Sequence, residues 1–169
     1  MSLHSDPNDP TQVYQWHRLS DMLTTSGQPS EAQLVEIAAL GVRHVINLGP
    51  HEHEKALPDE RASVEALGMT YTYIPVDFEN PAETDFMRFG QAMDALAGEP
   101  VHIHCIANLR VSAFLYRYRR DVLGIEPEMA LAEMDRLWCP GGEWARFVGH
   151  ADEVELPTRY AAYHYQPDE

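Results

Sequence analysis

A buried strand that runs directly into a helix constrains the fold of this chain more than any other feature. Val101 to His104 predicts a short, buried strand inside a sheet. Cys105 ends this strand, and a helix begins near Val111 and continues to Leu123. The tight loop between them consists of Ile106, Ala107, Asn108, Leu109 and Arg110. A strand that feeds a helix in this way is the building unit of parallel sheets.

The rest of the chain repeats this alternation of strand and helix. Further strands are expected at 23–26, 43–48 and 69–76, and further helices at 11–22, 30–40, 58–67, 80–97, 127–138 and 143–150. The pattern predicts an α/β fold with three layers, in which a central, mostly parallel sheet of about four or five strands is flanked by helices. Ligands of such sheets bind outside the carboxyl ends of the strands, which is where Cys105 is expected.

Two helix starts carry capping signals. Ser30 followed three residues later by Gln33 predicts a capping box. Asn80 followed by Pro81 and Glu83 predicts a second helix start, with proline at the first helical position.

The length of 169 residues suits one domain. We expect a flexible N-terminal arm over 1–12, a domain over 13–154 and a polar C-terminal tail over 155–169. The first ten residues lack the basic and apolar regions of a signal peptide, and no apolar run is long enough to span a bilayer. Two cysteines make no disulfide framework, so we expect a reduced, cytoplasmic setting.

The charge balance restricts the partners. The chain carries 27 acidic and 12 basic residues, for a formal net charge of −15. An acidic surface repels phosphate backbones and anionic lipids, so nucleic acid and membranes are not expected as partners. Any anion site must therefore be positive locally, against the field of the whole molecule.

The stretch around Cys105 has the chemistry of such a site. Helix N-terminal amides and a guanidinium both favour a thiolate and bind an oxyanion, so Cys105 and Arg110 suggest a nucleophile at the floor of an anion pocket. Ser112 is placed to donate to the thiolate or to help a leaving group depart, and His104 to order the loop. Asn108 tolerates left-handed dihedral angles at the apex of the loop. The purely structural alternative is a buried strand with an inert thiol.

The residues His104-Cys105, a short loop, and Arg110 and Ser112 at a helix start resemble the cysteine-dependent protein tyrosine and dual-specificity phosphatases. More closely, the chain resembles a bacterial phosphatase-like domain that also occurs fused to beta-lactamase-like hydrolases. The quoted segments are TSGQPS at 25–30, GVRHVINL at 41–48 and IPVDFENP at 74–81. The resemblance implies a cysteine phosphatase-like fold, a phosphocysteine intermediate, no metal or other cofactor, and a phosphorylated small molecule or phosphoprotein as substrate.

The resemblance also implies a general acid on the loop between the third strand and the next helix. Asp77 stands at the matching place, and Glu79 is the second candidate. A carboxylic acid there protonates the leaving oxygen and then acts as base toward water. The alternative is a carboxylate that only shapes a turn.

The spacing departs from the phosphatase pattern, which has five residues between cysteine and arginine. This chain has four, so Val111 occupies the family's arginine position while Ser112 stays in register. One residue turns a helix by about 100° and advances it by ~1.5 Å, which changes where the guanidinium points. Three functions stay open: a phosphatase with an altered loop, a rhodanese-like sulfurtransferase that carries a persulfide on Cys105, and a non-catalytic domain that binds phosphate or a phosphoprotein.

A metal site is the remaining alternative. His102 and His104 lie on one side of the predicted strand, and His51-Glu52-His53-Glu54 adds possible ligands. No third ligand is spaced to join the two strand histidines, so we expect a solvated loop at 51–54 and no metal.

Overall fold

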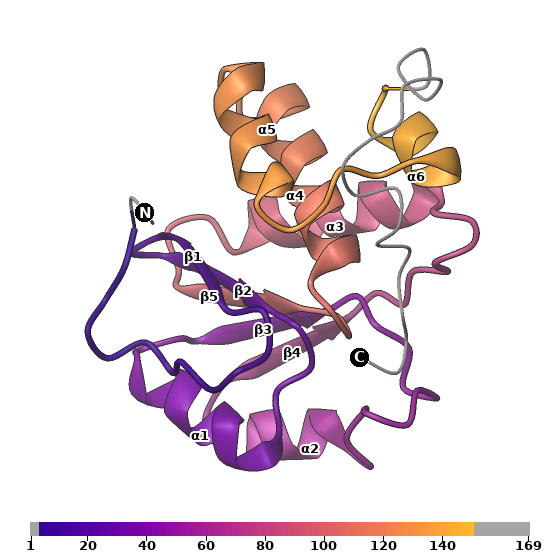
Figure 1. The fold of residues 1–169 in the computed structure, drawn as a ribbon. Coiled ribbons are helices and arrows are strands. Elements are labelled where there is room, and N and C mark those ends of the chain that lie inside the picture. Colours follow the sequence, from indigo (N-terminus) through magenta and orange to yellow (C-terminus); the bar gives the residue numbers. More distant parts are fainter. Residues whose placement is uncertain (1–3, 151–169) are drawn as a thin grey trace.

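Five strands form one mixed sheet in the computed structural model, which describes residues 4–150 (Figure 1). Their spatial order is β1-β2-β5-β3-β4, and only β1 runs antiparallel to its neighbour. The predicted, mostly parallel sheet is confirmed. The strands are β1 (His17–Ser20), β2 (Leu23–Ser26), β3 (His44–Asn47), β4 (Thr70–Tyr73) and β5 (Val101–His104).

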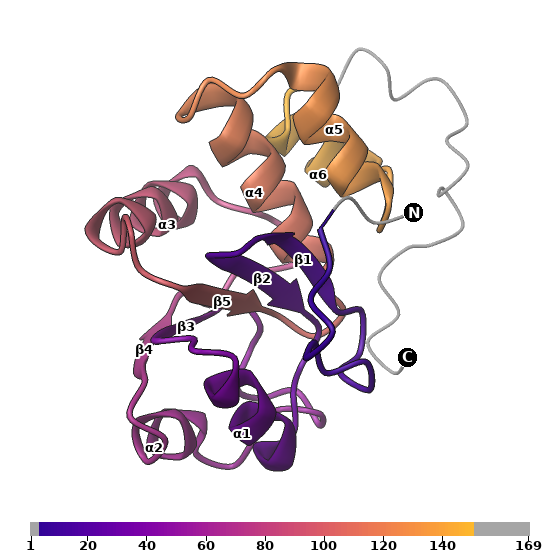
Figure 2. The ribbon, with the colours of Figure 1, turned by 90° about the vertical axis from the view of Figure 1, so that its left-hand side faces the viewer.

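Helices cover both faces of this sheet, which confirms the three-layer α/β architecture. One group of helices lies on one side of the sheet and a second group on the other, as both views show (Figures 1 and 2). The first group is α1 (Glu31–Ala39) and α2 (Glu60–Glu65); the second is α3 (Glu83–Ala95), α4 (Leu109–Asp121), α5 (Pro127–Asp135) and α6 (Gly142–Phe147).

Each face has its own apolar core. The larger core includes Ile103 of β5 and Phe114 of α4, both fully buried. The smaller core includes Leu34 and Ile37 of α1 with Val64 of α2, also fully buried. Both faces of β5 are covered, and all four of its residues are buried, as expected for a strand at the centre of a parallel sheet.

The helix predicted at 11–22 is wrong. Turns occupy most of 11–15, and β1 follows from His17. His17 pairs with Thr25 and Arg18 with Thr24 of β2, so β1 and β2 form an antiparallel ladder. This segment is a strand because it pairs with β2. Such pairing cannot be predicted from the local propensities of its residues.

The two capping signals had different outcomes. Ser30 and Gln33 form the predicted capping box, with each side chain accepting from the other residue's backbone N–H. The helix start predicted at Asn80 is wrong, because α3 begins at Glu83 and Ala82 is its N-cap. The backbone N–H of Asn80 instead donates to the carbonyl of Asp77 and closes a turn.

The helix after the thiol also begins earlier than predicted, at Leu109 rather than near Val111. Near the N-terminus, within the segment expected to be an arm, Asp9 forms an ion pair of 2.6 Å with Arg18 of β1. The C-terminal tail expected over 155–169 lies outside the described residues. Among the described helices, none has the length and apolar character needed to cross a membrane.

Candidate active site

Cys105 follows the last residue of the central strand and is fully buried, with 0% of its surface exposed. The sheet holds the backbone on both sides of this point. Leu48 N–H donates to His104 O at 2.8 Å, and Cys105 N–H donates to Ser26 O at 3.4 Å. The thiol therefore projects from a fixed backbone at the carboxyl edge of the sheet.

Two glycines let neighbouring segments approach the loop after Cys105. A Cβ on Gly27 would lie 2.4 Å from the carbonyl oxygen of Ile106, and one on Gly49 would lie 3.2 Å from the Cα of Cys105. The contact at Gly27 leaves no room for a side chain, and the one at Gly49 is tighter than an ordinary van der Waals contact. Gly27 belongs to the segment TSGQPS, and Gly49 directly follows the segment GVRHVINL, so the loop packs against the chain at both places.

Asn108 turns the chain from the loop into α4. Its φ of 65° is left-handed, as predicted, and its side-chain Nδ2 donates to Gln15 O and to Thr25 Oγ1, both at 2.9 Å. The loop of Ile106, Ala107 and Asn108 is buried throughout. The first amides of α4 have no acceptor within the helix, so this end carries a partial positive charge suited to an anion.

Arg110 lies in the first turn of α4 and is buried, with 3% exposed. Its Nε donates to the carbonyl of Val76 at 2.9 Å, and the guanidinium carbon lies 5.0 Å from the ring centre of Phe78. The structure thus brings Arg110 to the loop that carries Asp77.

Two side chains hold that loop. Trp144 of α6 donates its Nε1 hydrogen to Phe78 O at 2.8 Å, in addition to the hydrogen bond from Arg110 to Val76 O. Asp77 is exposed, and its Oδ1 accepts from the N–H of Glu79, which is exposed as well. The side chain of Asp77 therefore faces solvent, while hydrogen bonds hold its neighbours Val76 and Phe78 in place.

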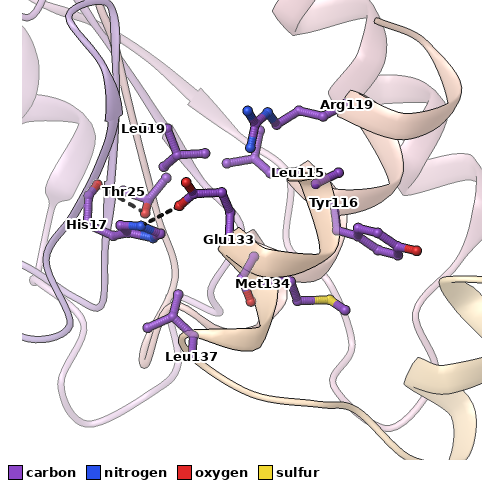
Figure 3. Close-up of a pocket in the computed structure, with 11 residues that line it drawn as sticks. His17, Leu19, Thr25, Leu115, Tyr116, Arg119, Glu133, Met134 and Leu137 are labelled. Atoms are coloured by element: carbon purple, nitrogen blue, oxygen red, sulfur yellow. Dashed lines mark hydrogen bonds and ion pairs between the residues drawn. The ribbon is translucent and has the colours of Figure 1, made fainter. Parts of the chain in front are cut away.

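Ser112 is directed elsewhere. Its hydroxyl donates to Leu109 O at 2.9 Å, so its one proton is committed to its own helix. Its side chain also borders a cavity of about 10 Å³ beneath β1 and β2, where His17 and Glu133 form an ion pair of 2.7 Å (Figure 3). A space of this size holds about one water molecule, so it is not a substrate site.

His104 forms a buried ion pair that sequence reasoning missed. Its Nε2 lies 2.8 Å from Oε2 of Glu60 in α2, and its Nδ1 lies 3.1 Å from Cys105 O. Burial raises the pKa of Glu60, but the charge of His104 and hydrogen bonds from His104, Gln28 and Tyr71 outweigh it and bring that pKa to about 2. The carboxylate is therefore ionised at neutral pH.

His102 has a different environment. Thr24 Oγ1 lies 2.8 Å from its Nδ1 and Ser26 Oγ 2.8 Å from its Nε2, so both ring nitrogens are occupied. Burial, together with the charge of His104, lowers the pKa of His102 well below its ordinary value and keeps the ring neutral. Within residues 4–150, no group of three or more His, Cys, Asp or Glu side chains is placed to hold a metal ion.

The structure resembles a solved protein of Shewanella putrefaciens CN-32 described as "Putative phosphatase (DUF442)". The two are 35% identical, the TM-score is 0.75, and the match covers 92% of this chain and 97% of the other. TpbA of P. aeruginosa, solved in complex with pTyr, has the same fold at 22% identity, with a TM-score of 0.60 over 75% of this chain and 74% of its own.

Curated sequences give a shorter match. A beta-lactamase hydrolase-like protein of Agrobacterium fabrum is 34% identical over 96 residues, which are 55% of this chain and 22% of that protein. The match thus spans about a fifth of the length of that relative. No family model matches the chain.

Proposed function

Since the chain belongs to the DUF442 family, whose fold is that of the cysteine-dependent phosphatases, we propose that it hydrolyses a phosphomonoester through a phosphocysteine intermediate on Cys105. The observation that carries the proposal is the position of the thiol. Cys105 directly follows the central strand, and a short loop leads from it to the N-terminus of α4, whose first turn places Arg110 against the loop that carries Asp77.

In the first step the thiolate of Cys105 attacks phosphorus. The sulfur–phosphorus bond forms, the bond to the leaving oxygen breaks, and Asp77 gives its proton to that oxygen. In the second step Asp77 takes a proton from water as the water oxygen attacks phosphorus. The sulfur–phosphorus bond then breaks, which releases inorganic phosphate and restores the thiolate.

The loop amides and Arg110 hold the phosphoryl oxygens through both steps. Positive groups fixed where charge develops stabilise the transition state without reorganising during the reaction. Their local charge opposes the net charge of −15 on the whole chain. The full burial of Cys105 means that the phosphoryl group must displace neighbouring side chains to reach the sulfur.

The test is hydrolysis of p-nitrophenyl phosphate by the wild type, Cys105→Ser and Cys139→Ser. Cys139, the other cysteine of the chain, forms no disulfide and is a matched control outside the strand–loop–helix unit. We expect turnover in the wild type and Cys139→Ser, and none in Cys105→Ser with its fold intact. Acid quenching should trap one phosphoryl group on Cys105. Turnover that survives the change at Cys105 would overturn the assignment of the nucleophile. Phosphotyrosine and phosphoserine peptides, assayed in parallel, then define the substrate.

One observation favours sulfur transfer as a second candidate. Only four residues separate Cys105 from Arg110, which makes a tighter loop than the phosphatase pattern. In this reaction Cys105 takes the sulfane sulfur of thiosulfate as a persulfide, releasing sulfite, and cyanide accepts that sulfur as thiocyanate. Thiocyanate production that depends on Cys105, in a protein without phosphatase activity, would favour this candidate over the first.

A further inference from the structure

Glu60 and His104 form a completely enclosed ion pair below the thiol. Their side chains are 1% and 0% exposed, and Oε2 of Glu60 lies 2.8 Å from Nε2 of His104. Glu60 comes from the start of α2, whereas His104 ends β5, so the pair joins two elements that are distant in sequence. A buried charge is costly unless it is paired and hydrogen-bonded, and a well-packed apolar pair is often as stable. Stability alone therefore does not explain this pair.

Both oxygens of the carboxylate lead to the loop after the thiol. Through Oε2, Glu60 holds His104, whose Nδ1 lies 3.1 Å from Cys105 O. Through Oε1, Glu60 accepts from Nε2 of Gln28 at 2.7 Å, and the backbone N–H of Gln28 donates to Ile106 O at 3.0 Å. One carboxylate thus fixes two consecutive carbonyl groups of the loop, those of Cys105 and Ile106.

The hydrogen bonds also define the charge of the imidazole. The carbonyl of Cys105 can only accept, so Nδ1 of His104 donates, and the ionised carboxylate requires Nε2 to donate as well. In this arrangement both ring nitrogens of His104 donate, one to the carboxylate of Glu60 and one to the carbonyl of Cys105. The other titratable groups that interact with the pair include His102, with its ring centre 6.3 Å from that of His104, and both Tyr71 and Tyr73.

We propose that Glu60 is a positioning residue, which orients the loop amides and the thiol of Cys105 through His104 and Gln28. This inference rests on the proposed phosphatase function for its effect on turnover, and on the hydrogen bonds alone for its effect on the loop. Fixed carbonyls define the peptide planes of the loop, so the amides point at the phosphoryl oxygens before substrate arrives.

The experiment compares Glu60→Gln with Glu133→Gln. Glu133 is a matched control because it forms the other close histidine–glutamate pair of the described residues, with His17 at 2.7 Å and outside the loop. Three quantities are measured at a temperature where every variant is folded: kcat and KM for p-nitrophenyl phosphate, amide hydrogen exchange at Ile106 and Ala107, and the ¹⁵N shifts of the His104 ring.

We expect Glu60→Gln to lower kcat by ~100-fold with a smaller change in KM, to speed exchange at both amides and to remove one ring proton from His104. Glu133→Gln should leave all three unchanged. The double variant Glu60→Gln/His104→Gln leaves no unpaired buried charge, so it tests loop exchange even where the single variant unfolds.

Two results would overturn the proposal: a neutral His104 in the wild type at pH 7, or a Glu60→Gln variant whose loop exchange matches that of Glu133→Gln. A wild type without turnover on any phosphate, but with the expected ring protons and loop exchange, would instead refute the phosphatase and leave the anchoring role of Glu60 in place.

Discussion

The Nε of Arg110 lies 2.9 Å from the carbonyl oxygen of Val76, so the first turn of α4 is tied to the loop that carries the candidate acid. The helix begins at Leu109, two residues before the start predicted from the sequence, which places Arg110 within its first turn. The short spacing after Cys105 thus gives the arginine a contact that bridges two parts of the proposed site.

Replacing Arg110 should weaken anion binding. A hydrogen bond to a charged group contributes about 1.5–3 kcal/mol, so Arg110→Ala should bind tungstate about 10- to 100-fold more weakly by calorimetry. Arg146→Ala is the control, because Arg146 is exposed on α6 and pairs with Glu143. Equal affinities in the wild type and Arg110→Ala would mean that the guanidinium serves only to hold the acid loop.

Replacing the carboxylate of Asp77 should slow the departure of poor leaving groups. We expect Asp77→Asn to lower kcat by about 10²- to 10⁴-fold for alkyl phosphates, and by progressively less as the leaving group becomes less basic, because a weakly basic oxygen departs without a proton. Glu79→Gln, two residues away on the same exposed loop, is the comparison. A loss confined to Glu79→Gln would transfer the acid role to that residue.

Adding a methyl group at Gly27 should disturb the thiol loop. The new Cβ would lie 2.4 Å from Ile106 O, so Gly27→Ala should cost about 1–3 kcal/mol in the free energy of unfolding and should reduce turnover. Gly90→Ala in α3 is the control, since no atom lies within 4 Å of its added Cβ. That change should stabilise the protein by up to about 1 kcal/mol, because alanine favours helix. Urea unfolding of both variants measures the two changes in the free energy of unfolding. Equal changes would refute the close contact between Gly27 and Ile106.

His102 should make stability depend on pH. Its pKa is lowered well below 6.5 in the folded protein, so the unfolded chain binds a proton near pH 6 that the folded chain does not bind. Relative to His102→Gln, the wild type should therefore lose about 1.4 kcal/mol in the free energy of unfolding for each pH unit below 6.5. Urea titrations from pH 7 to pH 5 measure this difference. Parallel pH curves for the two proteins would contradict a neutral, buried His102.

Local patterns predicted the fold where a signal and its structural consequence lie close in sequence. Ser30 and Gln33 cap α1 as predicted because the capping box involves only neighbouring residues. The strand–loop–helix unit around Cys105 is confirmed for a similar reason. β1 could not be predicted this way, since His17 is a strand residue only through its pairing with β2.

The residues of the candidate site also differ in whether the local sequence could predict them. Motif and family resemblance predict Cys105, Arg110 and Asp77 as site residues, and the structure brings Arg110 to the loop that carries Asp77. Glu60 was missed because an acidic residue in the first turn of a helix is ordinarily a surface residue that complements the helix dipole. Its partner is 44 residues away, and no feature of the local sequence reports that this carboxylate is buried.

The central place of β5 has a consequence for how the protein loses activity. Parallel partners, β2 and β3, hold this strand on both edges, whereas β1 closes one side of the sheet and has a single neighbour. Fraying of the outer strand leaves Cys105, the proposed nucleophile, in register, because both strands that pair with β5 stay in place. Heat inactivation should therefore be an all-or-none event that coincides with global unfolding, with no partly melted form that retains a disordered site.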